Sequence, residues 1–128
     1  MLLLDTHIVL AVLGLGGAVL PALMKDRMSS NAASFVSVVT VWEIAIKSRL
    51  GKLKLTIALD QLPRDIEQLN LRVLPVHVAH AIADIGIEPG TRDPFDRLLL
   101  GVCAAEGLKL VTLDRALSNH PLAWRAET

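Results

Sequence analysis

Short apolar segments alternate with segments of helical spacing along this chain. The apolar segments, rich in leucine and β-branched residues, predict strands at 1–4, 34–39, 72–75 and 108–113. Helical spacing predicts helices over 7–13, 19–28, 41–50, 57–69, 76–84 and 94–106. Shorter features are a polar turn at 29–33, an extended piece at 52–55, a loop at 86–92 and an edge strand near 123–125. Strands that alternate with helices favour an α/β fold, a three-layer sandwich around a mainly parallel sheet.

Length and composition limit the class of protein. The 128 residues predict one domain, 1–128, with a core of Leu, Val, Ile and Ala, because 52% of residues are hydrophobic and only 3% aromatic. Thirteen basic and thirteen acidic residues cancel, so any nucleic-acid surface must be local. A single cysteine, Cys103, excludes an internal disulfide and fits a reducing compartment such as the cytoplasm.

The apolar run at residues 8–24 is the segment that most resembles a membrane span. A span needs about 20 apolar residues, and this run is interrupted by Gly14, Gly16, Gly17 and Pro21. Asp5 and His7 occupy the place where a signal peptide carries basic residues. We therefore expect a buried helix and no membrane association.

Carboxylates lie at four junctions between predicted strands and helices or turns. They are Asp5, Glu43, the pair Asp93 and Asp96, and Asp114. The carboxyl ends of parallel strands meet at one edge of a sheet, where ligands bind. Carboxylates gathered there repel one another unless a cation neutralises them. Oxygen ligands suit Mg²⁺, which retains waters and accepts a phosphate substrate, so the pattern predicts metal-assisted phosphodiester hydrolysis.

Each of these acids also fits a helix cap. Thr40 and Glu43 match a capping box, and Asp93 before Pro94 matches an N-cap with Asp96 in the first turn. Asp5 can cap the first helix, and Asp114 can begin a turn. For any one acid alone, helix capping is favoured over a functional role at about even odds or better. Capping explains less well why all of these junctions carry an acid.

Three blocks of the sequence resemble the PIN-domain ribonucleases, and most of all the VapC-type toxins of bacterial toxin–antitoxin pairs. The blocks are LLLDTH, TVWEIAIKSRLGKL and RDPFDRLL with the following AAEGLKLVTLD, and the resemblance runs from about residue 2 to 121. DPFDR is typical of one subgroup. The segment AVLGLGG, the loop IEPGT and His120 depart from the family pattern without touching the acids.

The resemblance implies a PIN-like sandwich and an acidic site at Asp5, Glu43, Asp96 and Asp114, with Asp93 as an additional acid. It also implies Mg²⁺-dependent RNA cleavage, inhibition by a small antitoxin and homodimerisation. Asp5, Asp96 and Asp114 are predicted to bind Mg²⁺, for which Mn²⁺ can substitute. Glu43 is predicted to assist a second ion or the attacking water.

Several other residues have two interpretations. Thr6 either orients a ligand or water, or caps a helix. His7 is close enough to Asp5 for a catalytic role but is expected on the helix surface, and His77 with His80 lacks the third ligand that a zinc site needs. Cys103 is expected in the core.

Basic residues near the middle of the chain also have two interpretations. They are Lys47, Arg49, Lys52 and Lys54. They form either a solvated helix end or a track for the RNA backbone. Arg97 is expected to pair with a carboxylate. Only four aromatic residues, with no tyrosine, are present for base stacking, so RNA shape and backbone are expected to guide substrate choice.

We predict a metal-dependent endoribonuclease acting as a toxin. One alternative is a PIN-fold module that binds partners without catalysis. Another is a phosphatase or phospho-acceptor domain, which would carry an acidic doublet or DxD motif after the first strand, where this chain has Asp5-Thr6-His7.

Overall fold

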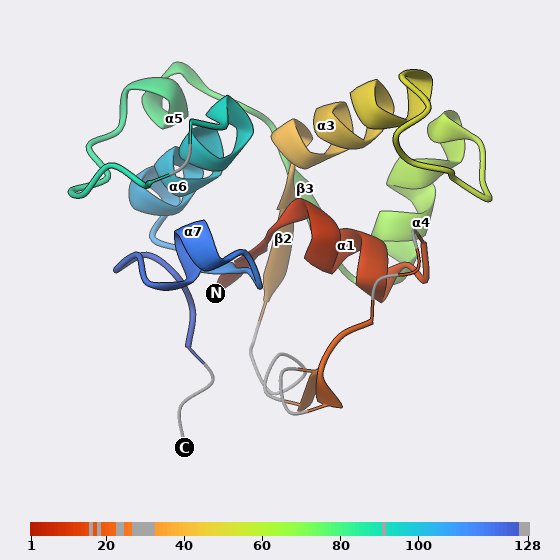
Figure 1. Cartoon of the computed structure of the whole chain (residues 1–128), viewed down its shortest axis with the longest axis horizontal. Helices are drawn as coiled ribbons and strands as arrows, with labels where there is room; N and C mark the ends of the chain where they lie inside the picture. The colour runs from red at the N-terminus through yellow and green to blue at the C-terminus, as the bar shows by residue number, and fades with distance from the viewer. Residues whose placement is uncertain (16, 18, 23–24, 27–32, 91, 126–128) are drawn as a thin grey trace.

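A parallel β-sheet with helices on both faces forms the protein, as the computed structural model shows (Figure 1). The structure describes residues 1–15, 17, 19–22, 25–26, 33–90 and 92–125. Its elements in chain order are β1 (Leu2–Leu4), α1 (Thr6–Val12), β2 (Ser34–Ser37), α3 (Val38–Arg49), η1 (Leu59–Gln61), α4 (Leu62–Gln68), β3 (Arg72–Leu74), α5 (Val78–Ile82), α6 (Pro94–Glu106), β4 (Lys109–Val111) and α7 (Arg115–Ser118).

The strand order is β3-β2-β1-β4, and every pairing is parallel. Leu2 pairs with Ser34 on one side and with Lys109 on the other. The chain therefore builds the sheet outward from β1 in one direction and then crosses to the opposite side for β4. Such a reversal of strand order leaves a crevice at the carboxyl ends of the central strands.

Alternation along the strands divides the core into two layers. Leu2 and Leu4 pack with α1 and α4, whereas Leu3 packs with the buried face of α6. In β4, Val111 belongs to the first cluster and Leu110 to the second. Because side chains alternate across a strand, a run of leucines fills both faces of the sheet. The predicted three-layer α/β arrangement is confirmed.

The clearest helix, α6, has the predicted bounds. Asp93 is its N-cap and accepts a hydrogen bond from the backbone N–H of Phe95 at 2.9 Å. Gly107 ends it with φ 70°, a left-handed conformation that glycine adopts without a steric penalty. Pro94 occupies the first turn, where its missing N–H costs no hydrogen bond.

The start of α3 corrects the sequence-based prediction. The sequence predicts a strand through Val38 and Val39 and an N-cap at Thr40, but the helix begins at Val38 and its N-cap is Ser37. The Ser37 hydroxyl accepts a hydrogen bond from the N–H of Val39 at 3.0 Å. Burial of Val39 in the second core cluster outweighs the weak preference of valine for strands. The capping-box interpretation of Thr40 and Glu43 is therefore wrong.

Other boundaries differ by smaller amounts. The helix predicted over 57–69 is divided into η1 and α4, with Pro63 in the first turn of α4. Helix α5 is shorter than the predicted 76–84, and residues 52–55 form no strand. The edge strand predicted near 123–125 is a single bridge between Leu110 and Ala123. The helix predicted over 19–28 and the turn at 29–33 lie partly outside the described residues.

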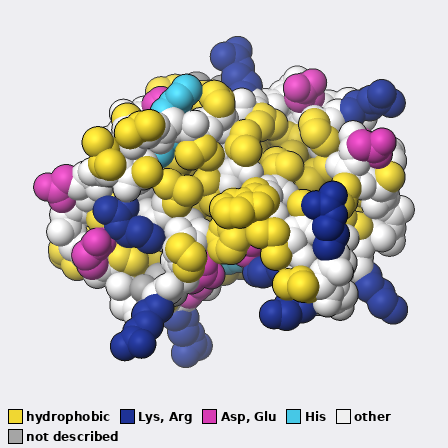
Figure 2. All heavy atoms as spheres, turned by 90° about the horizontal axis from the view of Figure 1, so that it is seen from above, with side chains coloured by type: hydrophobic (Ala, Val, Ile, Leu, Met, Phe, Trp, Pro, Cys, Tyr) yellow, Lys and Arg dark blue, Asp and Glu magenta, His cyan; other side chains and the backbone are white. Residues whose placement is uncertain are grey.

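One face of the molecule, formed by α3, α5 and α6, gathers hydrophobic side chains (Figure 2). Exposed residues of α3 and α5 include Val38, Trp42, Val78 and Ile82. The Trp42 ring meets Phe95 of α6 edge-on, with ring centroids 5.3 Å apart. In the described part of the chain, no helix is long and apolar enough to cross a membrane.

Candidate active site

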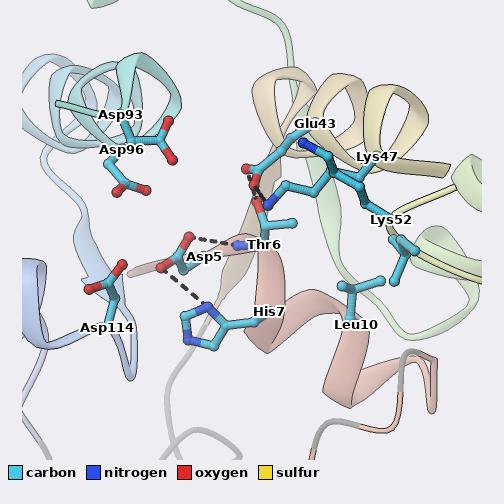
Figure 3. Close-up of a pocket in the computed structure, with 11 residues that line it drawn as sticks. Asp5, Thr6, His7, Leu10, Glu43, Lys47, Lys52, Asp93, Asp96 and Asp114 are labelled. Carbon is cyan, nitrogen blue, oxygen red and sulfur yellow. Dashed lines mark hydrogen bonds and ion pairs between the residues drawn. The ribbon is translucent and has the colours of Figure 1, made fainter. Parts of the chain in front are cut away.

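A pocket of about 300 Å³ opens at the carboxyl edge of the sheet, where β1, β2 and β4 end. Acidic side chains reach it from four segments that are far apart in sequence (Figure 3). These acids are Asp5, Glu43, Asp93, Asp96 and Asp114. Two ammonium groups, those of Lys47 and Lys52, also line it. The structure therefore brings together every acid that the sequence singled out.

Asp5 follows β1 and is held at both carboxylate oxygens. Its Oδ1 accepts a hydrogen bond from the backbone N–H of Thr6 at 2.7 Å, and its Oδ2 accepts one from the Thr112 hydroxyl at 2.6 Å. Only 4% of Asp5 is exposed. Burial raises the pKa of Asp5 above its usual value, although hydrogen bonds from Thr112 and Thr6 and the nearby His7 oppose this shift.

Asp96 lies in the first turn of α6 and points into the pocket (Figure 3). It is 8% exposed, and among the described residues none donates a hydrogen bond to its carboxylate. Burial, followed by the charges of Asp93, Asp5, Asp114 and Glu43, raises the pKa of Asp96 to about 7. In the described part of the chain, the ionised form of Asp96 therefore has no ion-pair partner.

Glu43 is buried on the first turns of α3 and makes two short contacts. Its Oε1 accepts a hydrogen bond from the Thr6 hydroxyl at 2.7 Å, and its Oε2 lies 2.6 Å from the Lys47 ammonium. This contact, and the charges of Asp93 and Asp96, raise the pKa of Lys47. Thr6 thus orients an acid of the pocket, whereas the N-cap of α1 is Asp5.

Asp93 and Asp114 both cap helices at the edge of the pocket. Asp114 accepts a hydrogen bond from the N–H of Ala116 at 2.8 Å at the start of α7. Three of the acids that line the pocket, Asp5, Asp93 and Asp114, are therefore N-caps as well. Capping and a role in the pocket are compatible, since a carboxylate has two oxygens and several lone pairs.

The structure adds two residues to this region: Thr112, for which no role is predicted, and His7, which is expected on the helix surface. Thr112 donates to Asp5 and accepts a hydrogen bond from the N–H of Asp114 at 3.0 Å, so its hydroxyl links two acids. His7 lines the pocket, and its Nε2 accepts a hydrogen bond from the N–H of Leu113 at 3.0 Å. Their only sequence signal is closeness to Asp114 and Asp5.

Three other residues that the sequence singled out have contacts outside the pocket: His80, Arg97 and Cys103. His80 is buried, and its Nδ1 accepts a hydrogen bond from the N–H of His77. Arg97 pairs with Glu88 at 3.1 Å, as predicted. Cys103 is buried in the second core cluster, where burial raises the pKa of its thiol to about 12. Of the basic residues near the middle of the chain, Lys47 and Lys52 reach the pocket.

The fold and the pocket define an α/β protein with an acidic site at the switch point of a parallel sheet. The sequence matches the model of the PIN domain family over residues 2–121, and the chain belongs to this family. The predicted family resemblance is thereby confirmed at the family level. A search of curated proteins found no significant match.

A solved structure supports the same fold. It is a chain of a structure titled "Toxin-antitoxin complex from Klebsiella pneumoniae", which superposes with a TM-score of 0.66. The similarity covers 99% of this chain and 98% of that chain, at 14% sequence identity. At this identity the likeness concerns the fold.

Proposed function

We propose that this protein is a divalent-metal-dependent endoribonuclease of the PIN family. The observation that carries the proposal is Asp96, a buried carboxylate that faces four other acids with no hydrogen-bond donor to it in the described chain. A cation is the partner that removes this repulsion. The PIN family match supports nuclease chemistry as the use of such a cation.

The side chains that line the pocket suit Mg²⁺ or Mn²⁺ both in their ligand atoms, which are oxygens, and in their negative charge. Every acid of the pocket offers carboxylate oxygens, the ligands that hard cations prefer. Among the described residues, no group of three or more His, Cys, Asp or Glu side chains forms a ready-made metal cluster. We therefore expect the acids to line a site that is completed when the ion and its waters are present.

Asp5, Asp96 and Asp114 are the residues that would hold the ion. When bound, Mg²⁺ would polarise the phosphoryl oxygen and lower the pKa of a water. Hydrogen bonds from Thr112 and Thr6 fix the Asp5 carboxylate in place. Thr6 also orients Glu43, and in this proposal Glu43 would assist the attacking water. Asp93 serves mainly to hold the start of α6, from which Asp96 projects.

We further propose that the protein is the toxin of a VapC-type pair of the DPFDR subgroup, and that residues 1–128 form a single PIN domain. The solved chain from Klebsiella pneumoniae comes from a structure titled as a toxin–antitoxin complex, which supports an antitoxin partner here. Exposed hydrophobic residues such as Trp42 and Ile82 supply surface for an antitoxin or a second copy of the chain. A cytoplasmic homodimer is the expected form.

The test is RNA cleavage by purified protein freed of any antitoxin. Mixed RNAs are incubated with Mg²⁺, with Mn²⁺ or with EDTA, and new ends are mapped. We expect ends only with metal, and none with the Asp96→Asn variant. Cleavage that persists in EDTA would rule out the metal mechanism. Binding of an antitoxin without any cleavage would favour a non-catalytic PIN module.

The proposed assembly is tested separately. Sedimentation over a range of concentrations should reveal a dimer, and expression without an antitoxin should inhibit growth. A strictly monomeric protein that is tolerated at high expression would contradict the proposed toxin.

A further inference from the structure

The positive charges of the pocket are confined to one side of it. Lys47 and Lys52 come from α3 and the segment after it, whereas Asp96 and Asp114 lie on the opposite side (Figure 3). Among the described residues, no Lys or Arg forms an ion pair with Asp5, Asp96 or Asp114. The side formed by these three acids is therefore the part of the pocket that needs an external cation.

The side formed by Glu43 already holds a cation. The Lys47 ammonium lies 2.6 Å from Glu43 Oε2, and the two residues are one helical turn apart on α3. Glu43 is buried, with 6% exposure, and its other oxygen accepts the hydrogen bond from Thr6. Glu43 therefore differs from Asp5, whose carboxylate also accepts two hydrogen bonds, in having a Lys ammonium in direct contact with one oxygen.

A divalent ion on Glu43 would have to displace Lys47 or lie beside it. Mg²⁺ binds carboxylate oxygens at about 2.0–2.1 Å. Like charges a few ångströms apart in a partly buried site repel strongly. An ammonium group donates hydrogen bonds and accepts none, so it cannot share the ion as a ligand.

We propose that the Lys47 ammonium takes the place of a second metal ion beside Glu43, so that the pocket binds a single divalent cation at Asp5, Asp96 and Asp114. This inference rests on the proposed function, since it assumes that the pocket binds a metal. It makes Glu43 a residue held by Lys47 and Thr6, and it removes the second ion that Glu43 was predicted to assist.

The experiment counts bound Mn²⁺ by the loss of the electron paramagnetic resonance signal of the free ion. The wild-type protein should bind about one Mn²⁺ per chain. Lys47→Gln retains an N–H donor for Glu43 but removes the charge, so it should bind about two. Lys47→Arg retains the charge and should bind about one. Lys52→Gln is the matched control, because it removes a pocket charge that has no Glu43 contact, and it should also bind about one.

The double variant Lys47→Gln/Glu43→Gln should return to about one Mn²⁺, since the carboxylate for the second ion is gone. If Lys47→Gln is unstable, this double variant keeps the inference open to test, because it removes the ammonium without leaving the Glu43 carboxylate unpaired. A second Mn²⁺ on it would overturn the pairing of Lys47 with Glu43 as the reason for a single ion. Two Mn²⁺ ions on the wild type, or one on folded Lys47→Gln, would overturn the proposed role of Lys47 and leave the proposed function standing. A second Mn²⁺ ion on Lys52→Gln would show that the total charge of the pocket decides the number of bound ions. That result would also overturn the specific role of Lys47. No Mn²⁺ on the wild type would instead overturn the proposed function together with this inference.

Discussion

At the scale of single residues, Asp96 combines burial with repulsion. The side chain lies in the first turn of α6, and the positive end of a helix favours an ionised carboxylate. Burial and four surrounding acids nevertheless raise its pKa to about 7. A buried carboxylate that neighbouring acids repel is destabilised in its ionised form, and a bound cation would remove that destabilisation. Perturbed pKa values of this kind are typical of functional sites.

The stability of the metal-free protein should depend on pH through Asp96. Its pKa is 3.8 as the ordinary value and about 7 in the fold. Between these values the folded protein holds a proton that the unfolded chain lacks, so the free energy of unfolding falls as pH rises from about 4 to about 7. Denaturation in EDTA should show a smaller fall for Asp96→Asn and a more stable variant at pH 8. Identical pH profiles for both proteins would contradict this assignment.

At the scale of elements, helix starts place the acids. Asp5, Asp93 and Asp114 are N-caps of α1, α6 and α7, and all three helices begin at the carboxyl edge of the sheet. A cap joins local stability to the site, because the same side chain caps the start of the helix and lines the pocket. Capping and metal binding can still be separated by mutation.

Asp93→Ala should destabilise the protein by about 1 kcal/mol, because it removes the hydrogen bond to the N–H of Phe95. It should retain at least part of the RNA cleavage, since Asp96 stays in place. Asp93→Asn is the control, because an asparagine oxygen caps equally well. Thermal melts and cleavage rates decide between the roles. A folded Asp93→Ala protein with no activity, beside a fully active Asp96→Asn, would mean that the ligand and the cap are reversed.

Helices α5 and α6 approach closely at Gly101. A Cβ added there would clash with the backbone oxygen of His80, so the helices would have to separate. Gly101→Ala should therefore destabilise the protein by about 1–3 kcal/mol, the usual cost of overpacking. Gly90→Ala is the control, because nothing lies within 4 Å of the Cβ it would add. Equal stability of the two variants in urea would show that α5 moves aside without cost.

At the scale of the whole molecule, the parallel sheet collects acids that repel one another. β1, β2 and β4 bring segments that are up to 107 residues apart in sequence into contact, as in the hydrogen bond from Thr112 to Asp5. Folding without metal must overcome the repulsion among these carboxylates. A bound cation should therefore stabilise the entire fold.

Mg²⁺ should raise the melting temperature, and EDTA should reverse the change. At a concentration 100 times its Kd, a ligand that binds only the folded state adds about 2.7 kcal/mol. Asp114→Asn should show a smaller shift, because a ligand is lost while asparagine retains the cap of α7. NaCl at matched ionic strength is the control for screening. No Mg²⁺-dependent shift in the wild type would contradict a metal site.

The sequence by itself determined the fold class, the bounds of α6 and the identity of the acids. These depend on neighbouring residues: alternation and apolar runs define strands, and Asp93-Pro94 with Gly107 defines a helix and its ends. Local signals failed where a distant contact decided the outcome. Val38 and Val39 form the start of α3 because this places the Val39 side chain in the second core cluster.

Only the tertiary structure decided which partners each acid has. Thr112 and His7 reach the site through hydrogen bonds to Asp5 and to Leu113, across more than a hundred residues. The pairing of Glu43 with Thr6 depends on where α3 begins and how β1 and β2 lie side by side. Such contacts depend on strand order and helix placement, which no short stretch of sequence encodes.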